Sequence, residues 1–154
     1  MINTTIRTSC EFKQSPEIIW LGITNDVMMY PKPFCFNLWV PSPIKCEITN
    51  TTNGIGKTRR CTSSNGSIEQ VITCYQPLEK LTFHMATHNL KTKFKIGMMD
   101  DEFIFTTIGG GKTKLQRTTN ISIPLGFGFL IRKWAITRSI RNVHQYVYNN
   151  IKMK

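Results

Sequence analysis

An apolar stripe in the last segment of the chain is the feature that most narrows the choice of fold. Its members recur at spacings of four, three, four and four residues: Ile136, Ile140, Val143, Val147 and Ile151. This spacing places all of them on one face of an α-helix. A helix with one apolar face has to bury that face against another layer of the protein. The sequence therefore predicts a long helix over residues 130–150 that packs on a partner formed by the preceding residues.

That partner is predicted to be an antiparallel β-sheet. Runs rich in β-branched and aromatic residues alternate with turn-forming residues. The predicted strands cover residues 2–12, 44–49, 55–63, 67–75, 81–87, 102–108 and 113–123. Asn65-Gly66 and Gly109-Gly110-Gly111-Lys112 mark two hairpin turns. Consecutive strands joined by short turns pair antiparallel, so we expect a curved sheet of about six to seven strands.

One or two short helices are expected after the first strand. Ser15 suits the N-cap, Pro16 the first helical position and Glu17 the first turn. Residues 31–43 are rich in Pro and aromatic residues, which predicts an irregular crossing that closes one end of the core. The fold class is therefore α+β, in a single domain over residues 1–154.

The strongly basic composition bears on partners. The formal net charge is +11, from 20 Lys and Arg against 9 Asp and Glu, which favours anionic partners or a dispersed excess that aids solubility. The tightest basic groups are Lys91, Lys93 and Lys95, and Arg132, Lys133, Arg138 and Arg141. We expect weak, salt-sensitive association with anionic surfaces and no specific nucleic acid, because no ribonucleoprotein motif is present.

Cysteine usage and apolar segments bear on the cellular compartment. Cysteines occupy positions 10, 35, 46, 61 and 74 without C-x-x-C spacing, so neither a zinc site nor a disulfide framework is predicted. The first residues lack the basic and apolar regions of a signal peptide. The apolar stretch 121–131 is too short for a transmembrane segment. We expect a cytoplasmic protein with five reduced thiols.

Two glycine-containing segments are similar to nucleotide-binding motifs but do not fit them. The first glycine of a P-loop ending in Gly111-Lys112-Thr113 would fall at position 106, which is Thr106. Gly54-Ile55-Gly56 lacks the third glycine of a dinucleotide fingerprint, since position 59 is Arg59. Turn geometry with positive φ explains these glycines better.

No metal, cofactor or catalytic set is predicted. His84 and His88, with Asp100-Asp101 as the nearest carboxylates, form an incomplete ligand set for a metal. No nucleophile, base and orienting group stand together, so a binding protein is favoured over an enzyme.

Three segments resemble one known group of proteins. Ser15-Pro16-Glu17-Ile18-Ile19-Trp20 resembles the "S-P-E-x-V-W" helix start of START-like (SRPBCC) proteins, the polyketide cyclase/dehydrase and lipid-transport group. Gly54-Ile55-Gly56-Lys57-Thr58-Arg59 with Gly66-Ser67-Ile68-Glu69 is similar to their "G-x-G-x-x-R…G-x-x-E" hairpin. Residues 76–83 are similar to their "P-x-x-L-x-F" turn and strand. The resemblance covers essentially the whole chain. It implies a helix-grip fold, in which a curved sheet wraps around a long C-terminal helix, and a pocket for apolar ligands, but no single activity.

The ligand cavity is expected between the sheet and the long helix. Apolar alternation of Leu115, Ile121 and Ile123 predicts which face of the last strand points inward, and Arg117 shares that face. His144 borders the apolar stripe, either as a satisfied buried histidine or as a polar contact in the cavity. The predicted cavity wall consists of Phe83, Met85, Phe103, Phe105, Leu115, Arg117, Ile136, Ile140, Val143 and His144.

Two arginines are candidate polar anchors for a ligand. Arg60 is expected to pair with Glu69 across the Asn65-Gly66 hairpin. Arg59 then points to the opposite face, where it could meet a carboxylate or carbonyl group. Arg117 on its apolar face needs a partner, which is either an acidic side chain or a ligand head group.

These features together predict binding or carriage of an apolar or amphipathic small molecule, lipid-like or polycyclic, in the cavity. An enzyme of the polyketide cyclase/dehydrase type that uses the same cavity is the first alternative. Binding of polyanions or of a membrane surface through the basic surface is the second.

Overall fold

A computed structural model describes residues 1–24, 26–27, 43–48, 54–91 and 97–153. The elements follow the order β1 Ile2–Phe12, α1 Pro16–Thr24, β2 Asp26–Val27, β3 Pro43–Ile48, β4 Thr58–Ser63, β5 Gly66–Gln76, β6 Lys80–His88, β7 Met99–Ile108, β8 Lys112–Ile123 and α2 Phe129–Lys152. Most of the predicted irregular crossing at 31–43 lies outside the described residues. In the described part of the chain, no helix combines the length and the apolar character needed to cross a membrane.

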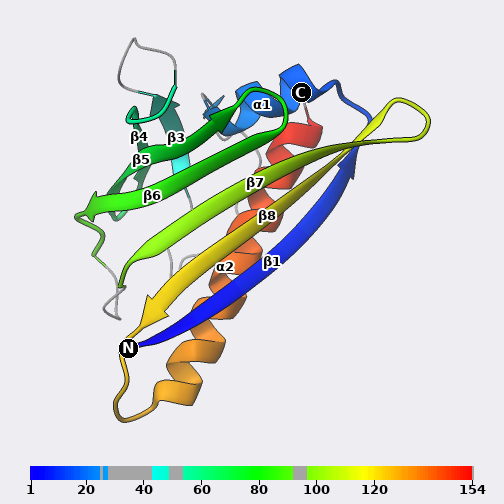
Figure 1. Ribbon diagram of the computed structural model, residues 1–154. Coiled ribbons are helices and arrows are strands. Elements are labelled where there is room, and N and C mark those ends of the chain that lie inside the picture. The colour runs from blue at the N-terminus through cyan, green and yellow to red at the C-terminus, as the bar shows by residue number, and fades with distance from the viewer. Residues whose placement is uncertain (25, 28–42, 49–53, 92–96, 154) are drawn as a thin grey trace.

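The described strands form one antiparallel sheet in the order β1-β8-β7-β6-β5-β4-β3-β2. The two-residue β2 makes the sheet one strand larger than the six to seven that the sequence predicts. Figure 1 shows the sheet curving around α2, with α1 at the end of the molecule where α2 terminates. This arrangement confirms the predicted α+β helix-grip architecture.

The long helix α2 buries its apolar stripe as predicted. Ile136, Ile140, Val147 and Ile151 are buried, and Val143 is half-buried. The C-terminal half of α2 packs into the larger core cluster with α1 and β6 to β8. Ile136 and Ile140 belong to a second cluster, with residues of β1 and β8.

The short helix α1 begins where its sequence predicts. The Ser15 carbonyl oxygen accepts a hydrogen bond from the Ile19 N–H at 3.3 Å. A hydrogen bond from the Ser15 side chain lowers the pKa of Glu17 in the first turn. Gly22 faces α2 so closely that a Cβ atom there would lie 2.8 Å from Cγ1 of Ile151. The glycine therefore allows the two helices to pack directly on each other.

The β4–β5 hairpin is displaced by one position from its prediction. Its turn is Ser64-Asn65, and Gly66 begins β5, instead of an Asn65-Gly66 turn. Gly66 has a φ of 130°, and a Cβ atom there would lie 2.7 Å from the backbone oxygen of Asn89. The glycine is therefore required by this close approach of neighbouring backbone.

The shifted register changes the residues that face each other across this hairpin. Arg60 lies directly opposite Glu69, instead of diagonal to it, and forms the expected exposed ion pair. Arg59 lies opposite Gln70, not opposite Ile72 as an Asn65-Gly66 turn would require. The three glycines 109–111 form the predicted hairpin turn between β7 and β8, with positive φ at Gly110 and Gly111.

The expectation of five reduced thiols is wrong at two positions. A disulfide joins Cys46 of β3 to Cys61 of β4. These cysteines are distant in sequence but lie directly opposite each other on neighbouring strands, where Cβ atoms are close. Cys10 and Cys74 are free and half-buried, and Cys35 lies outside the described residues.

Candidate ligand-binding cavity

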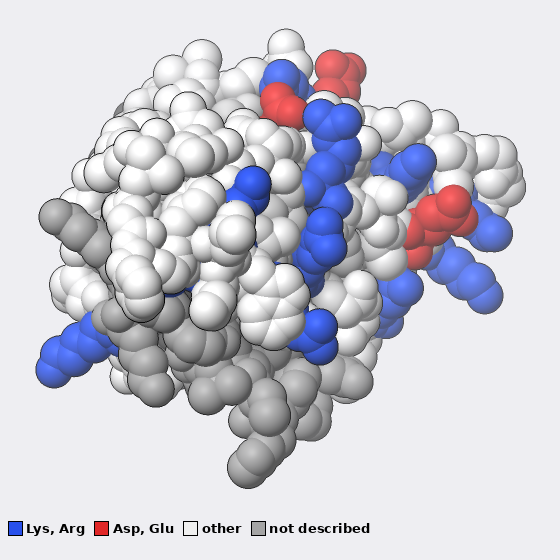
Figure 2. Space-filling model, turned by 90° about the horizontal axis from the view of Figure 1, so that it is seen from below, with Lys and Arg blue, Asp and Glu red and all other residues white. Residues whose placement is uncertain are grey.

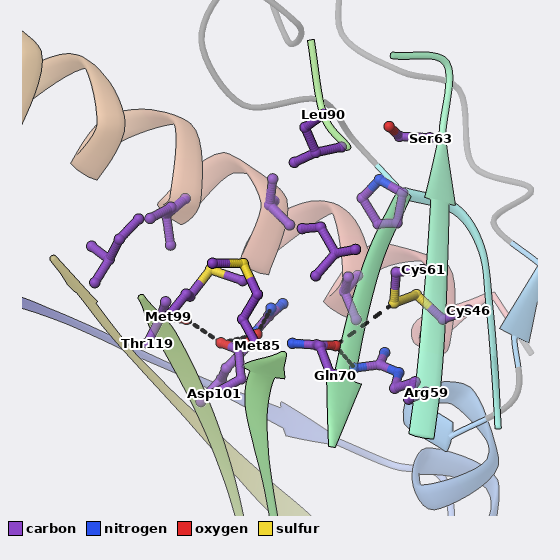
Figure 3. A pocket seen from close by; sticks show the side chains of 17 residues that line it. Cys46, Arg59, Cys61, Ser63, Gln70, Met85, Leu90, Met99, Asp101 and Thr119 are labelled. Atoms are coloured by element: carbon purple, nitrogen blue, oxygen red, sulfur yellow. Dashed lines mark hydrogen bonds and ion pairs between the residues drawn. A yellow bond between two sulfur atoms is a disulfide. The ribbon is translucent and has the colours of Figure 1, made fainter. Parts of the chain in front are cut away.

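A cavity of about 80 Å³ lies between the concave face of the sheet and α2 (Figure 3). Apolar side chains of the sheet and of α2 form most of its wall, and polar groups are restricted to a few positions. The described lining residues are Pro43, Cys46, Arg59, Cys61, Ser63, Ile68, Gln70, Met85, Leu90, Met99, Asp101, Arg117, Thr119, Ile121, Ile140, Val143 and Val147.

Part of the predicted wall lines this cavity. Met85, Arg117, Ile140 and Val143 do so, and so does the candidate anchor Arg59.

The other predicted wall residues are buried beside the cavity. The larger core cluster contains Phe83, Phe103, Phe105 and Leu115. Ile136 lies in the second cluster, and His144 is fully buried. The guanidinium groups of Arg59 and Arg117, which line the cavity, lie over the rings of Phe83 and Phe103. Phe83 and Phe103 pack edge-to-face with centroids 5.9 Å apart, and Trp20 of α1 packs on Phe105 at 5.5 Å.

A buried ion pair forms one polar part of the cavity wall. Arg117 Nη2 lies 2.8 Å from Oδ2 of Asp101, and Arg117 Nε donates to Oδ1 of the same carboxylate at 3.3 Å. Thr119, directly opposite Asp101 on the neighbouring strand, donates a further hydrogen bond to Oδ1. The sequence leaves open whether a side chain or a ligand neutralises Arg117. In the structure this partner is Asp101, so Arg117 already has the counter-ion that an anionic ligand would provide.

The ion pair keeps Asp101 ionised despite its burial. Burial by itself raises the pKa of this carboxyl group, but the charge and hydrogen bonds of Arg117 outweigh that effect. His144 and Thr119 lower the pKa further, and the result is a decrease from 3.8 to about 2. Asp101 is therefore a fixed negative charge across the whole physiological pH range.

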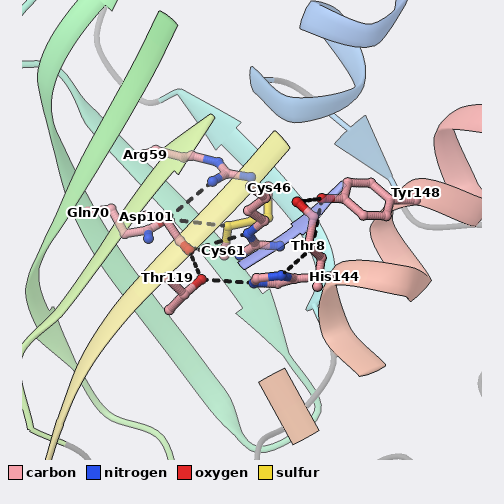
Figure 4. Close-up of polar contacts among 10 residues, drawn as sticks. Thr8, Cys46, Arg59, Cys61, Gln70, Asp101, Thr119, His144 and Tyr148 are labelled. Carbon is pink, nitrogen blue, oxygen red and sulfur yellow. Dashed lines mark hydrogen bonds and ion pairs between the residues drawn. A yellow bond between two sulfur atoms is a disulfide. The ribbon is translucent and has the colours of Figure 1, made fainter. Parts of the chain in front are cut away.

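A chain of hydrogen bonds leads from this carboxylate through His144 of α2 and Thr8 of β1 to Tyr148, which follows His144 by four residues on α2 (Figure 4). Thr119 Oγ1 lies 2.8 Å from Nε2 of His144. On the other side of the imidazole, Thr8 Oγ1 lies 2.8 Å from Nδ1 and 2.8 Å from the hydroxyl of Tyr148.

The carboxylate fixes the direction of the hydrogen bonds as far as His144. An ionised carboxylate only accepts hydrogen bonds, so the hydroxyl proton of Thr119 points to Asp101. The Nε2–H of His144 then donates to Thr119. In a neutral imidazole with its proton on Nε2, Nδ1 accepts the hydroxyl proton of Thr8, and Tyr148 donates to Thr8.

Electrostatics favour this neutral imidazole. Burial lowers the pKa of His144, the positive charge of Arg117 lowers it further, and Asp101 opposes both only in part. The pKa falls from 6.5 to about 3. Burial also raises the pKa of Tyr148, which keeps its hydroxyl protonated as a donor.

Arg59 and Gln70 form a second polar region of the wall. Arg59 is 4% exposed, and its Nη1 donates to Oε1 of Gln70 at 3.3 Å. Its guanidinium lies over the ring of Phe83, 4.5 Å from the centroid. Figure 3 shows this pair beside the disulfide between Cys46 and Cys61. A buried guanidinium in a cavity wall suits a ligand oxygen that carries negative charge or a carbonyl dipole.

No metal-binding cluster of three or more His, Cys, Asp or Glu side chains occurs among the described residues. His84 pairs with Asp100 alone, with Nδ1 2.5 Å from Oδ1, on the exposed side of the sheet.

Asp101 and Gln70 also line the cavity, although neither was predicted to do so. A signal for Asp101 was present, because Asp101, Phe103 and Phe105 alternate along one face of β7. Gln70 could be placed only with the correct hairpin register, which the Asn65-Gly66 motif did not provide.

Solved structures share this fold over nearly the entire chain. The aromatase/cyclase Zhui from Streptomyces sp. R1128 superimposes with a TM-score of 0.68 at 11% identity, covering 98% of this chain and 92% of that one. A START superfamily protein from Mycobacterium smegmatis gives 0.62 at 15% identity, with 97% of each chain covered. Ara h 8.0201 gives 0.62 at 8% identity, covering 99% of this chain and 100% of that one. A scan of protein-family models finds no match, and a search of curated proteins finds no significant one. The chain therefore has the START-like helix-grip fold of these structures.

Proposed function

We propose that this protein binds an apolar or amphipathic small molecule in the cavity between the sheet and α2. The observation that carries the proposal is a mainly apolar cavity with polar groups at only a few positions of its wall. Ligand sites in proteins have this composition, because apolar walls provide affinity and a few polar groups fix orientation.

The size of the cavity limits which ligands fit without rearrangement. A cavity on the order of 150 Å³ accepts a benzene molecule, whereas this one measures about 80 Å³. Met85 and Met99 are part of its wall, and unbranched methionine side chains repack readily. We therefore expect single-ring or short-chain compounds to bind after a small displacement of these two side chains, and longer lipid-like or polycyclic ligands to require a larger one.

Arg59 is the proposed contact for the ligand's polar group. Its buried guanidinium lines the cavity, lies over the ring of Phe83 and donates through Nη1 to Oε1 of Gln70. A ligand carboxylate at Arg59 would gain charge-assisted hydrogen bonds, while its apolar tail lies against the methionines and α2.

A titration with two chain-matched probes tests the proposal. Octanoate and 1-octanol differ only in the head group, and isothermal titration calorimetry measures their dissociation constants. Ile140→Phe adds bulk to the cavity wall and should weaken both probes by about tenfold or more, because it removes space. Ile131→Phe makes the same change on the exposed side of α2, where Ile131 is 67% exposed, and should leave both constants unchanged.

A second variant isolates the anchor. Arg59→Gln should weaken octanoate by about tenfold and leave 1-octanol within about twofold, since only the acid uses the guanidinium. Two results would exclude this cavity as the ligand site. The first is that the wild-type protein binds neither probe, and the second is that the Ile140→Phe variant binds both probes as tightly as the wild type does. Equal loss of both probes in Arg59→Gln would leave the cavity in place and remove Arg59 as the anchor.

A further inference from the structure

Large apolar side chains are exposed where the chain enters α2. The exposed fractions are 58% for Leu125, 106% for Phe127, 77% for Leu130, 67% for Ile131 and 61% for Trp134. Single exposed apolar residues are ordinary on soluble proteins, but a group of this kind marks an interaction surface. We refer to these five residues as the apolar tip.

Basic side chains follow the apolar tip along the same helix. Lys133, Arg138 and Arg141 are exposed and line a shallow hollow together with Leu130 and Trp134 of the tip. We refer to these three residues as the basic band. The guanidinium of Arg138 lies 5.8 Å from the ring centroid of Trp134, so the tip and the band are continuous.

Charge on this end of the molecule is strongly asymmetric. Residues 124–154 include no Asp or Glu. Figure 2 views the molecule from the end at which α2 begins, and Lys and Arg side chains form a band across this view, with few acidic side chains. The surface is therefore complementary to a partner that is negatively charged.

The order of apolar and basic residues along α2 matches the layers of a phospholipid bilayer. A helix rises 1.5 Å per residue, so Arg138 and Arg141 lie about 6 Å and about 10 Å beyond Trp134 along the axis. Apolar side chains of peripheral helices enter the headgroup and acyl boundary by about 5–10 Å. With the apolar tip at that depth, the basic band lies at the level of the lipid phosphates. Lys133, nearer the tip, can extend its ammonium group to the same level.

We propose that the apolar tip and the basic band dock the protein on the surface of an anionic phospholipid membrane. Nucleic acid would use the basic band but leave the apolar side chains in water. A second copy of the chain paired through this face would bring two basic bands together, and the like charges would repel. A bilayer with anionic headgroups satisfies both parts of the surface. This proposal does not depend on the ligand of the cavity.

Vesicle co-sedimentation tests the proposal with matched variants. The probes are phosphatidylcholine vesicles with about one-third phosphatidylserine, and pure phosphatidylcholine vesicles. Arg138→Gln/Arg141→Gln should lower partitioning to the anionic vesicles by about tenfold to thirtyfold. Lys112→Gln/Lys114→Gln removes the same charge at exposed positions of β8, next to the β7–β8 hairpin turn, and should change partitioning far less.

The apolar tip is tested separately. Phe127→Ser should weaken binding to anionic vesicles, whereas Ile55→Ser, at a site that is 74% exposed, should not. Trp134 should be quenched by brominated lipid in the anionic vesicles, and Trp134→Phe should abolish that signal. Trp20 and Trp39 also contribute to the fluorescence, so the Trp134→Phe variant is the necessary reference.

Three results would overturn the proposal. The first is no binding of the wild-type protein to anionic vesicles. The second is an equal loss in both charge variants, which would mean that net charge alone drives binding. The third combines two observations: Phe127→Ser binds vesicles as the wild type does, and Arg138→Gln/Arg141→Gln loses the ability to bind an oligonucleotide. Together they would assign this surface to nucleic acid.

Discussion

Replacement of His144 should change how the stability of the protein depends on pH. The fully buried imidazole has a pKa of about 3 in the folded protein and 6.5 as the ordinary value. Below about pH 6.5 the unfolded chain binds a proton at this site that the folded chain does not bind until about pH 3. The free energy of unfolding contributed by His144 is therefore fully present above pH 6.5 and is lost as the pH falls.

The size of this effect follows from the separation of the two pKa values. Each pH unit between them corresponds to about 1.4 kcal/mol. The loss should reach about 3 kcal/mol between about pH 7 and about pH 4. Asp101, whose pKa is lowered to about 2, adds its own loss only below about pH 4, where its carboxylate is protonated in the unfolded chain.

Urea unfolding of the wild-type protein and of His144→Gln at several pH values measures the effect. Glutamine cannot titrate, so the wild-type free energy should fall by about 1.4 kcal/mol per pH unit relative to the variant. His88→Gln replaces a histidine outside the hydrogen-bond chain and is the matched control for the substitution. Parallel curves for the wild type and His144→Gln would refute the neutral imidazole and, with it, the proton directions assigned along the chain.

Three other parts of the structure lead to measurable outcomes. Asp101→Asn should lower the free energy of unfolding by about 3–5 kcal/mol, because it leaves Arg117 as a buried charge without its counter-ion. The double variant Asp101→Asn/Arg117→Met should recover part of that loss, and chemical denaturation measures both variants. Thiol titration of denatured protein should count two fewer thiols without reductant than with it, for Cys46 and Cys61, and equal counts would contradict the disulfide. Gly22→Ala should lower the melting temperature, with a cost of about 1–3 kcal/mol from overpacking against α2, and an unchanged melting temperature would show that the helices can separate freely.

Local signals were sufficient to predict the architecture. The spacing of the α2 stripe, the Ser15-Pro16 helix start and the alternation of the strands are properties of short segments, and the elements they specify can assemble in few ways. The Asn65-Gly66 turn shows where local signals fail. A glycine can satisfy a turn or a close backbone approach, and at Gly66 the contact with Asn89, which directly follows β6, decides between them.

Long-range pairing determined the parts of the site that the sequence did not reveal. The sequence placed Arg117 on an inward face, but its partner Asp101 lies on the neighbouring strand and depends on the β7–β8 register. The same reasoning applies to Cys46 and Cys61, which only the β3–β4 register brings together. Phe83, Phe103 and Phe105 were predicted as cavity wall and lie in the core beside the cavity, because the way their rings fill the core depends on tertiary packing that no local pattern encodes.

The pairing of β1 with β8 has a consequence for how the protein folds. β1 hydrogen-bonds along its whole length to a strand that follows it by about a hundred residues, from Phe12 opposite Thr113 to Ile2 opposite Ile123. Closing so large a loop is entropically costly, and contacts of such long range slow folding. During synthesis β1 therefore emerges long before its partner strand exists, and its backbone groups remain unpaired until β8 leaves the ribosome. The hydrogen bonds through Thr8 can form only after that step, so this buried network is among the last parts of the protein to form. A polypeptide whose synthesis stops before β8 would expose β1 as an unpaired strand, and such strands promote aggregation.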